Sequence, residues 1–244
     1  MKVGLFIPCY IDQLYPRVGI STQGLLEKLG VKVEYPLNQT CCGQPMANGG
    51  FEEYTVKTSR HFYESFHSYD YVVAPSGSCI AHVKNHLTGF DGHGNVFKNK
   101  AFELCEFLYD VLQVKALPGN FDEKVGLHKS CHGLRELRLG PSSEIKKDEV
   151  DKVSFLLNLI GGIELVDHPR ADECCGFGGT FAIGEEAVSV EMGTDRVKGY
   201  MEAGATVITA TDMSCLMHLE GIIKRKKYTN IEVVHVAEIL NSRY

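Results

Sequence analysis

The feature that most constrains this chain is an adjacent cysteine pair followed by glycine, which occurs twice. The first copy is CCGQP at 41–45 and the second is CCGFGG at 174–179. Each pair lies between two single cysteines, so the order C…CCG…C is found in both halves of the chain. A pattern repeated in this way predicts two copies of one structural unit.

The segments around the cysteines repeat as well. VGLFIPC (3–9) corresponds to VGLHKSC (125–131), and YVVAPSGSC (71–79) corresponds to TVITATDMSC (206–215). Between and after them we expect matching elements in each half: helices at 21–30 and 153–162, strands at 31–37 and 163–169, amphipathic helices at 51–68 and 184–203, and helices that begin near Ile80 and Leu216. Alternating strands and helices favour a parallel sheet covered by helices.

We therefore predict an α/β fold with two pseudo-symmetric lobes, each a small, mostly parallel sheet flanked by helices. The expected boundaries are 1–115 for the first lobe, 116–124 for a linker that contains Pro, Gly and Asn, and 125–244 for the second lobe. A loop is expected at 90–97 and a solvated helix start at 142–152. In open α/β sheets, ligands bind at the edge where the strands end, and the cysteines follow strand ends.

Composition narrows the class of protein. The net charge of −6 argues against non-specific binding of nucleic acid. No apolar run approaches the roughly 18 residues that a membrane helix needs, although peripheral association with a membrane stays compatible with the sequence. The start MKVGLFIPCY is interpreted as a buried strand, not a signal peptide. We expect a cytoplasmic protein, whose reduced cysteines act as ligands or redox groups instead of forming disulfides.

Eight of the nine cysteines form two sets of four, and only Cys105, on an apolar helical face, is expected in the core. The first set is Cys9, Cys41, Cys42 and Cys79, and the second set is Cys131, Cys174, Cys175 and Cys215. Four thiolates in one place repel each other unless a cation or a cluster lies between them. Iron–sulfur clusters and structural zinc sites both take four cysteines. The lack of the CxxC spacing of zinc sites favours iron–sulfur, with zinc left open.

The glycine after each pair has a physical role. Neighbouring side chains on a strand alternate sides, so a tight turn is needed to aim two adjacent cysteines at one point. Glycine permits that turn, and backbone N–H groups in it can donate to anionic sulfur. Of the histidines, His128 is a possible additional ligand beside Cys131, whereas His82 and His86 are expected on a solvated helix face. No nucleophile–base signature is present, so catalytic residues stay unknown.

The motifs CCGQP, APSGSC, DECCGFGGTF, TDMSCL and HVAEIL together resemble the duplicated cysteine-rich "CCG" domain. Within that group the chain is most similar to the lactate utilization protein A family, which is related to the glycolate oxidase iron–sulfur subunit and to the cysteine-rich subunit of heterodisulfide reductase. The last of these ends each motif in CxxC. Here Ser76 and Asp212 replace the first cysteine of that motif, which puts heterodisulfide chemistry in doubt and leaves both side chains as possible extra ligands.

The resemblance implies an iron–sulfur electron-transfer subunit of a multi-protein L-lactate oxidising system, with two [4Fe–4S] clusters held by the eight cysteines. Such a chain would be a non-autonomous oxidoreductase subunit of an L-lactate dehydrogenase complex that passes electrons toward the respiratory chain. Its implied partners are a ferredoxin-like iron–sulfur subunit and a third small subunit. Two alternatives stay open: a thiol or disulfide reductase of the heterodisulfide-reductase type, and a scaffold protein stabilised by zinc.

Overall fold

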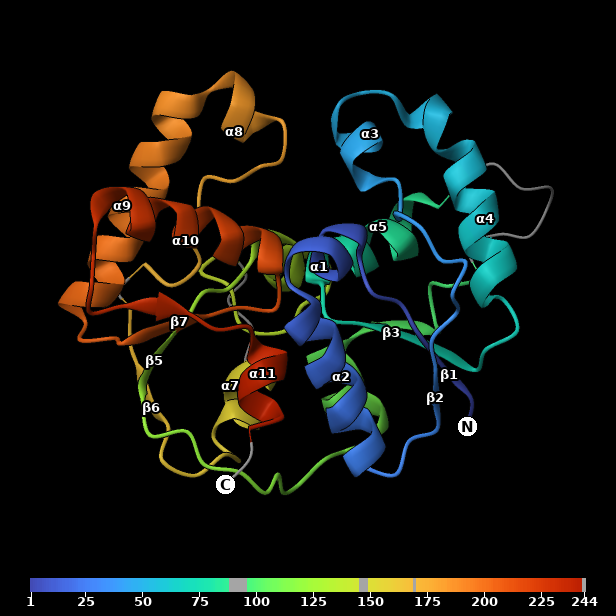
Figure 1. Cartoon of the computed structure of the whole chain (residues 1–244), viewed down its shortest axis with the longest axis horizontal. Helices are drawn as coiled ribbons and strands as arrows, with labels where there is room; N and C mark the ends of the chain where they lie inside the picture. The colour runs from blue at the N-terminus through green and yellow to red at the C-terminus, as the bar shows by residue number, and fades with distance from the viewer. Residues whose placement is uncertain (88–95, 145–148, 169, 243–244) are drawn as a thin grey trace.

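The protein contains two four-stranded sheets, and all strand pairs in both are parallel. The computed structural model describes residues 1–87, 96–144, 149–168 and 170–242. The first sheet has the order β2-β1-β3-β4 and the second has the order β6-β5-β7-β8. Their bounds are β1 Val3–Leu5, β2 Val33–Glu34, β3 Tyr71–Ala74, β4 Ala101–Glu103, β5 Lys124–Leu127, β6 Glu164–Val166, β7 Val207–Thr209 and β8 Glu232–Val233. The predicted pair of α/β lobes is confirmed (Figure 1).

Helices follow the strands in the predicted order. In the first half these are α1 Cys9–Leu14, α2 Pro16–Lys28, α3 Gln44–Asn48, the 3₁₀ turn η1 Glu52–Thr55, α4 Val56–Phe66, α5 Gly77–His86, α6 Leu104–Glu106 and the π-helical turn η2 Phe107–Val111. In the second half they are the π-helical turn η3 His132–Glu136, α7 Lys152–Leu157, α8 Phe181–Gly184, α9 Glu186–Glu202, α10 Met213–Lys226 and α11 Val236–Leu240. Residues 90–95 of the expected loop and 145–148 of the expected helix start lie outside the described residues.

The two sheets have equivalent registers. Val3 of β1 pairs with Val33 and Tyr71 on its two sides, and Val125 of β5 pairs with Leu165 and Val207. The central strands β1, β3 and β7 are short and mostly buried apolar runs, as is typical of parallel sheets, and β5 is buried in its middle at Val125 and Gly126. The sequence repeat is thus a structural repeat.

A glycine in each central strand lets an aromatic ring approach the sheet closely. A Cβ atom on Gly4 would lie 2.8 Å from the ring of Tyr69 and 3.0 Å from that of Phe66. A Cβ atom on Gly126 would lie 2.4 Å from the ring of Tyr200. The rings of Phe66 on α4 and Tyr200 on α9 therefore occupy equivalent places in the two lobes.

The lobes exchange helices reciprocally. The helix after the last strand of the second sheet, α11, packs against α2 of the first half, and α6, which follows the last strand of the first sheet, packs against α7 of the second half. Figure 1 shows α11 and α2 side by side at the centre of the molecule. Both exchanged helices begin with a capping box, formed by Glu103 with Glu106 and by His235 with Glu238.

Residues 112–123, which include most of the linker expected at 116–124, contain no helix or strand beyond a single bridge between Asn120 and Gly161, and Lys124 begins β5. In the described part of the chain, no helix combines the length and the apolar character that crossing a membrane requires.

We predict that Gly126→Ala destabilises the protein by about 1–3 kcal/mol, because the added methyl group overlaps the buried ring of Tyr200. Urea denaturation of variant and wild type in the same metal state measures this. Gly221→Ala is the control, since nothing lies within 4 Å of its Cβ position on α10. That variant should be neutral or gain up to about 1 kcal/mol of helix propensity. An unchanged free energy of unfolding for Gly126→Ala would contradict the close packing.

Candidate functional site

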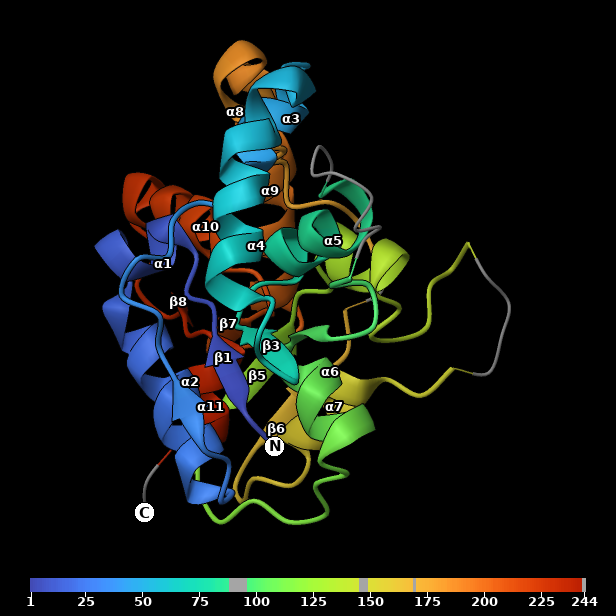
Figure 2. The ribbon, with the colours of Figure 1, turned by 90° about the vertical axis from the view of Figure 1, so that its right-hand side faces the viewer.

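All eight cysteines of the two sets line a single cleft between the lobes. Its volume is about 570 Å³. Residues of α3 from the first lobe and of α8 from the second line it as well, and Figures 1 and 2 show these two helices at the same edge of the molecule. The remaining wall is mostly apolar and includes Pro8, Phe177 and Met217. The two sets therefore face a common space, as expected from their equivalent strand ends.

Equivalent elements position the cysteines of both sets. Cys9 begins α1 after strand β1, and Cys131 directly precedes η3 after strand β5. Cys79 and Cys215 lie in the first turns of α5 and α10, the helices that follow β3 and β7. Because the strands within each sheet are parallel, their carboxyl ends bring these cysteines to one edge.

The adjacent pairs are turned by the glycine that follows them. Gly43 has a φ of 95° and Gly176 has a φ of 91°, values that side chains rarely allow. In each turn the glycine N–H donates to the sulfur of the first cysteine of the pair, at 3.4 Å from Gly43 N to Cys41 Sγ and 3.3 Å from Gly176 N to Cys174 Sγ. The predicted turn and its N–H donor are confirmed in both copies.

The thiols of each set form the same chain of contacts. Hydrogen bonds from Cys42 and Cys9 lower the pKa of Cys41 to about 2. In the second set, hydrogen bonds from Cys131 and Cys175 lower the pKa of Cys174 to about 2. The donating thiols have raised pKa values, chiefly because they donate to that thiolate. Without a metal, each set thus holds one thiolate that accepts hydrogen bonds from two thiols, and binding of a metal ion or cluster would displace the protons of those thiols.

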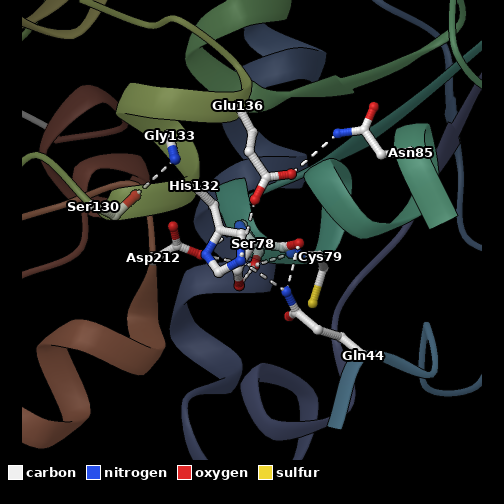
Figure 3. A network of polar contacts seen from close by, with 10 residues as sticks. Gln44, Ser78, Cys79, Asn85, Ser130, His132, Gly133, Glu136 and Asp212 are labelled. Atoms are coloured by element: carbon white, nitrogen blue, oxygen red, sulfur yellow. Dashed lines mark hydrogen bonds and ion pairs between the residues drawn. The ribbon is translucent and has the colours of Figure 1, made fainter. Parts of the chain in front are cut away.

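Ser76 and Asp212 bond each other across the boundary between the lobes. The Ser76 hydroxyl donates to Asp212 Oδ1 at 3.2 Å, and the same carboxylate oxygen accepts the Ser78 N–H at 2.8 Å (Figure 3). Ser76 Oγ also accepts the N–H of Cys79 at 3.3 Å and so caps α5. Both residues are buried. Their side chains therefore hold the two lobes together beside the cysteine cleft.

A second polar contact joins the lobes at the cleft wall. Gln44 of α3 donates to the backbone oxygen of Ser78 at 3.1 Å, and its amide nitrogen lies 3.3 Å from His132 Nε2 (Figure 3). His132 is in turn 3.5 Å from Glu136, which accepts a hydrogen bond from Asn85 at 3.0 Å. Gln44 could not be predicted from the sequence, because nothing in its spacing indicates a partner in the other half.

The structure corrects the expectation for His82. The sequence predicted a solvated helix face for His82 and His86, but His82 is only 3% exposed. The turn that follows the first cysteine pair packs against this face of α5, which a single-helix pattern does not reveal. Burial lowers the pKa of His82 to about 4, and its ring lies beside the turn at Gly43.

His128 lies at the second set. One of its ring nitrogens and the sulfur atoms of Cys175 and Cys215 all lie within 4.8 Å of one another, close enough to hold one metal ion. The ninth cysteine, Cys105, is fully buried on α6 in the interface between the lobes, as predicted for a core residue.

Comparisons with known proteins agree with this geometry. The model of a family described as "Cysteine-rich domain" (CCG) matches the chain twice, at residues 3–84 and 125–220. Lactate utilization protein A 1 of Bacillus mycoides is 38% identical over 248 residues, which cover 99% of this chain and 97% of that protein. Lactate utilization protein A of Halalkalibacterium halodurans is 39% identical, with 99% and 97% covered. The chain belongs to the lactate utilization protein A family.

A solved structure shares the fold of this family member. A hypothetical protein from Helicobacter pylori superposes with a TM-score of 0.59 at 14% sequence identity. The match covers 98% of this chain and 48% of that one, so the family fold here spans about half of the larger protein.

We predict that Gly176→Ala weakens metal binding by the second set about tenfold to hundredfold. The added Cβ would lie 2.6 Å from the Ser189 carbonyl oxygen at a positive φ, and such strain costs about 1–3 kcal/mol. Titration of the reduced, metal-free protein with Co²⁺, followed by thiolate-to-cobalt absorption, measures it.

Gly204→Ala is the matched control for Gly176→Ala. Gly204 has a φ of 83°, but none of the described residues lies within 4 Å of its Cβ position. Gly204→Ala therefore introduces the same backbone strain as Gly176→Ala without the steric clash. Equal loss of Co²⁺ affinity in the two variants would contradict a specific role for the turn at Gly176.

Proposed function

We propose that this protein is an iron–sulfur electron-transfer subunit of a multi-protein L-lactate oxidising system. The observation that carries the proposal is the pair of equivalent four-cysteine sets that face one cleft. Family membership supports the lactate assignment, because the relatives that the chain matches over nearly their full length are named for lactate utilization. We assign the protein to the cytoplasm, where its thiols stay reduced.

The residues present fit one four-cysteine cluster in each lobe. Cys9, Cys41, Cys42 and Cys79 would hold the first, and Cys131, Cys174, Cys175 and Cys215 the second. A [4Fe–4S] cluster takes four thiolates and supplies one-electron chemistry when bound. The chain itself supplies the thiolates, the glycine N–H donors to Cys41 and Cys174, and a mostly apolar wall. Hydrogen bonds to sulfur and solvent access are the means by which a protein sets a cluster potential.

Two features of the boundary between the lobes favour ordinary electron transfer over disulfide reduction. The positions at which the heterodisulfide-reductase relatives carry a further cysteine hold Ser76 and Asp212. Neither side chain has a sulfur atom with which to bind a non-cubane cluster. Instead they form a hydrogen bond with each other, and Ser76 caps α5. We therefore assign no catalytic residue to this chain and treat it as a subunit that completes lactate oxidation only with others. We propose the family's ferredoxin-like iron–sulfur subunit and small third subunit as its partners.

Anaerobically purified protein should contain about eight irons and eight sulfides per chain, because two four-iron clusters are expected. Cys42→Ser and Cys175→Ser should each lose about half of that content, whereas Cys105→Ala, outside the cleft, should keep it. Iron, sulfide and zinc analysis with EPR after dithionite reduction measures this. Stoichiometric zinc without sulfide, also after cluster reconstitution, would reject the iron–sulfur proposal and favour the zinc-stabilised scaffold.

The lactate assignment has its own test in growth. A bacterium that lacks its lactate utilization protein A, and therefore its growth on L-lactate, should regain that growth with the wild-type gene and with Cys105→Ala. Cys42→Ser and Cys175→Ser should fail, because each removes one of the four thiolates of a set. Growth on glucose controls for general fitness. Full rescue by both cysteine-to-serine variants would show that the two sets do not serve lactate oxidation.

A further inference from the structure

The two lobes differ in a buried residue that shortly precedes their cysteine sets in the chain. Three residues before the first cysteine of each set, the chain has Phe6 in the first lobe and His128 in the second. Both side chains are fully buried and follow the matched central strands β1 and β5. Since the cysteines, glycines and strand registers around them repeat, this substitution is a difference within an otherwise equivalent environment.

At two further matched positions, an apolar residue of the first lobe corresponds to a polar residue of the second lobe. Phe66 and Tyr200 occupy equivalent places over Gly4 and Gly126, and four residues earlier lie Phe62 and Arg196. The first lobe thus has Phe6, Phe62 and Phe66, whose rings contact each other with centroids 4.7–5.7 Å apart. The second lobe has His128, Arg196 and Tyr200. The first lobe therefore has an apolar aromatic cluster where the second lobe has three buried polar side chains.

His128 has no hydrogen-bond partner among the described residues. Neither ring nitrogen is bonded and the residue is 0% exposed. In either protonation state an imidazole carries at least one N–H donor. Buried polar groups are rarely left unpaired in folded proteins. The nearest candidate acceptors are the sulfur atoms of Cys175 and Cys215, which lie within 4.8 Å of one ring nitrogen.

The buried guanidinium of Arg196 is near enough to His128 to act on it electrostatically. The guanidinium is 1% exposed and donates to Tyr200 Oη at 3.0 Å, to the Ala171 carbonyl at 3.2 Å and to the Arg170 carbonyl. In the described part of the chain no carboxylate lies within ion-pair distance of it. A buried cation without a counter-ion is costly unless negative charge lies nearby. The second set, loaded with an anionic cluster, supplies that charge.

We propose that His128, supported by Arg196, donates a hydrogen bond to the sulfur atoms of the second set and gives the group bound there a higher reduction potential than the group in the first lobe. This inference rests on the proposed iron–sulfur function. A donor role is favoured over ligation because the first set offers the same four cysteines with Phe6 in place of the histidine. Both a hydrogen bond to sulfur and a nearby positive charge stabilise the reduced, more negative state.

The test compares reduction potentials in the full chain. EPR-monitored redox titration of the wild type should resolve two potentials. His128→Phe, which installs the residue found in the first lobe, should lower the higher one by about 59 mV or more, a tenfold weaker affinity for one electron. The lower potential should not move. His128→Gln, which keeps an N–H donor, should recover part of the shift, and His168→Phe, at a buried histidine that packs on Tyr200, should shift neither potential.

Metal content and nitrogen hyperfine coupling separate a donor from a ligand. His128→Phe should keep the full iron and sulfide content, and pulsed EPR of the wild type should show weak histidine nitrogen coupling that disappears in the variant. Loss of one cluster in His128→Phe, or strong coupling typical of a direct Fe–N bond, would overturn the donor role. Two identical wild-type potentials, or no shift in His128→Phe, would overturn the inference while leaving the proposed function intact. A wild type without iron and sulfide would reject both.

Discussion

The four cysteine sulfur atoms that each lobe brings to the cleft are the constraint on which the rest of this structure depends. Thiolates that close repel each other, so the chain must hold them until a cation or cluster balances the charge. Two of the four come from adjacent residues, which a regular strand cannot aim at the same place. The left-handed glycine turn resolves this conflict, and its own N–H group stabilises the thiolate beside it.

The lobe boundary follows from the same constraint. Since both sets lie at the carboxyl edge of their sheets, a single cleft serves both, and the walls of that cleft come from both halves. The hydrogen bond between Ser76 and Asp212 fixes the distance between the two lobes beside the first turns of α5 and α10, the turns that contain Cys79 and Cys215. Rigid placement of this kind suits the proposed electron transfer, which depends on fixed separations and little movement of atoms.

Much of the fold and of the cysteine site could be predicted from the sequence, because the duplication shows each pattern twice. The order of strands and helices, the membership of the two cysteine sets and the glycine turns could each be checked against a second copy. What could not be predicted depends on contacts between residues far apart in the chain. Ser76 and Asp212 are separated by 136 positions, and His82 lies against the turn at Gly43, which comes much earlier in the chain. Local patterns contain no information about such neighbours.

The reciprocal exchange of α11 and α6 has a consequence for how the repeat can exist at all. A protein made of one repeat would leave uncovered the face of the helix, α2 or α7, that a helix of the other copy covers here. Two such molecules would satisfy each other only as a swapped homodimer. Joining both copies in one polypeptide makes that pairing independent of concentration. It also frees each copy to change alone, as Phe6 and His128 have done.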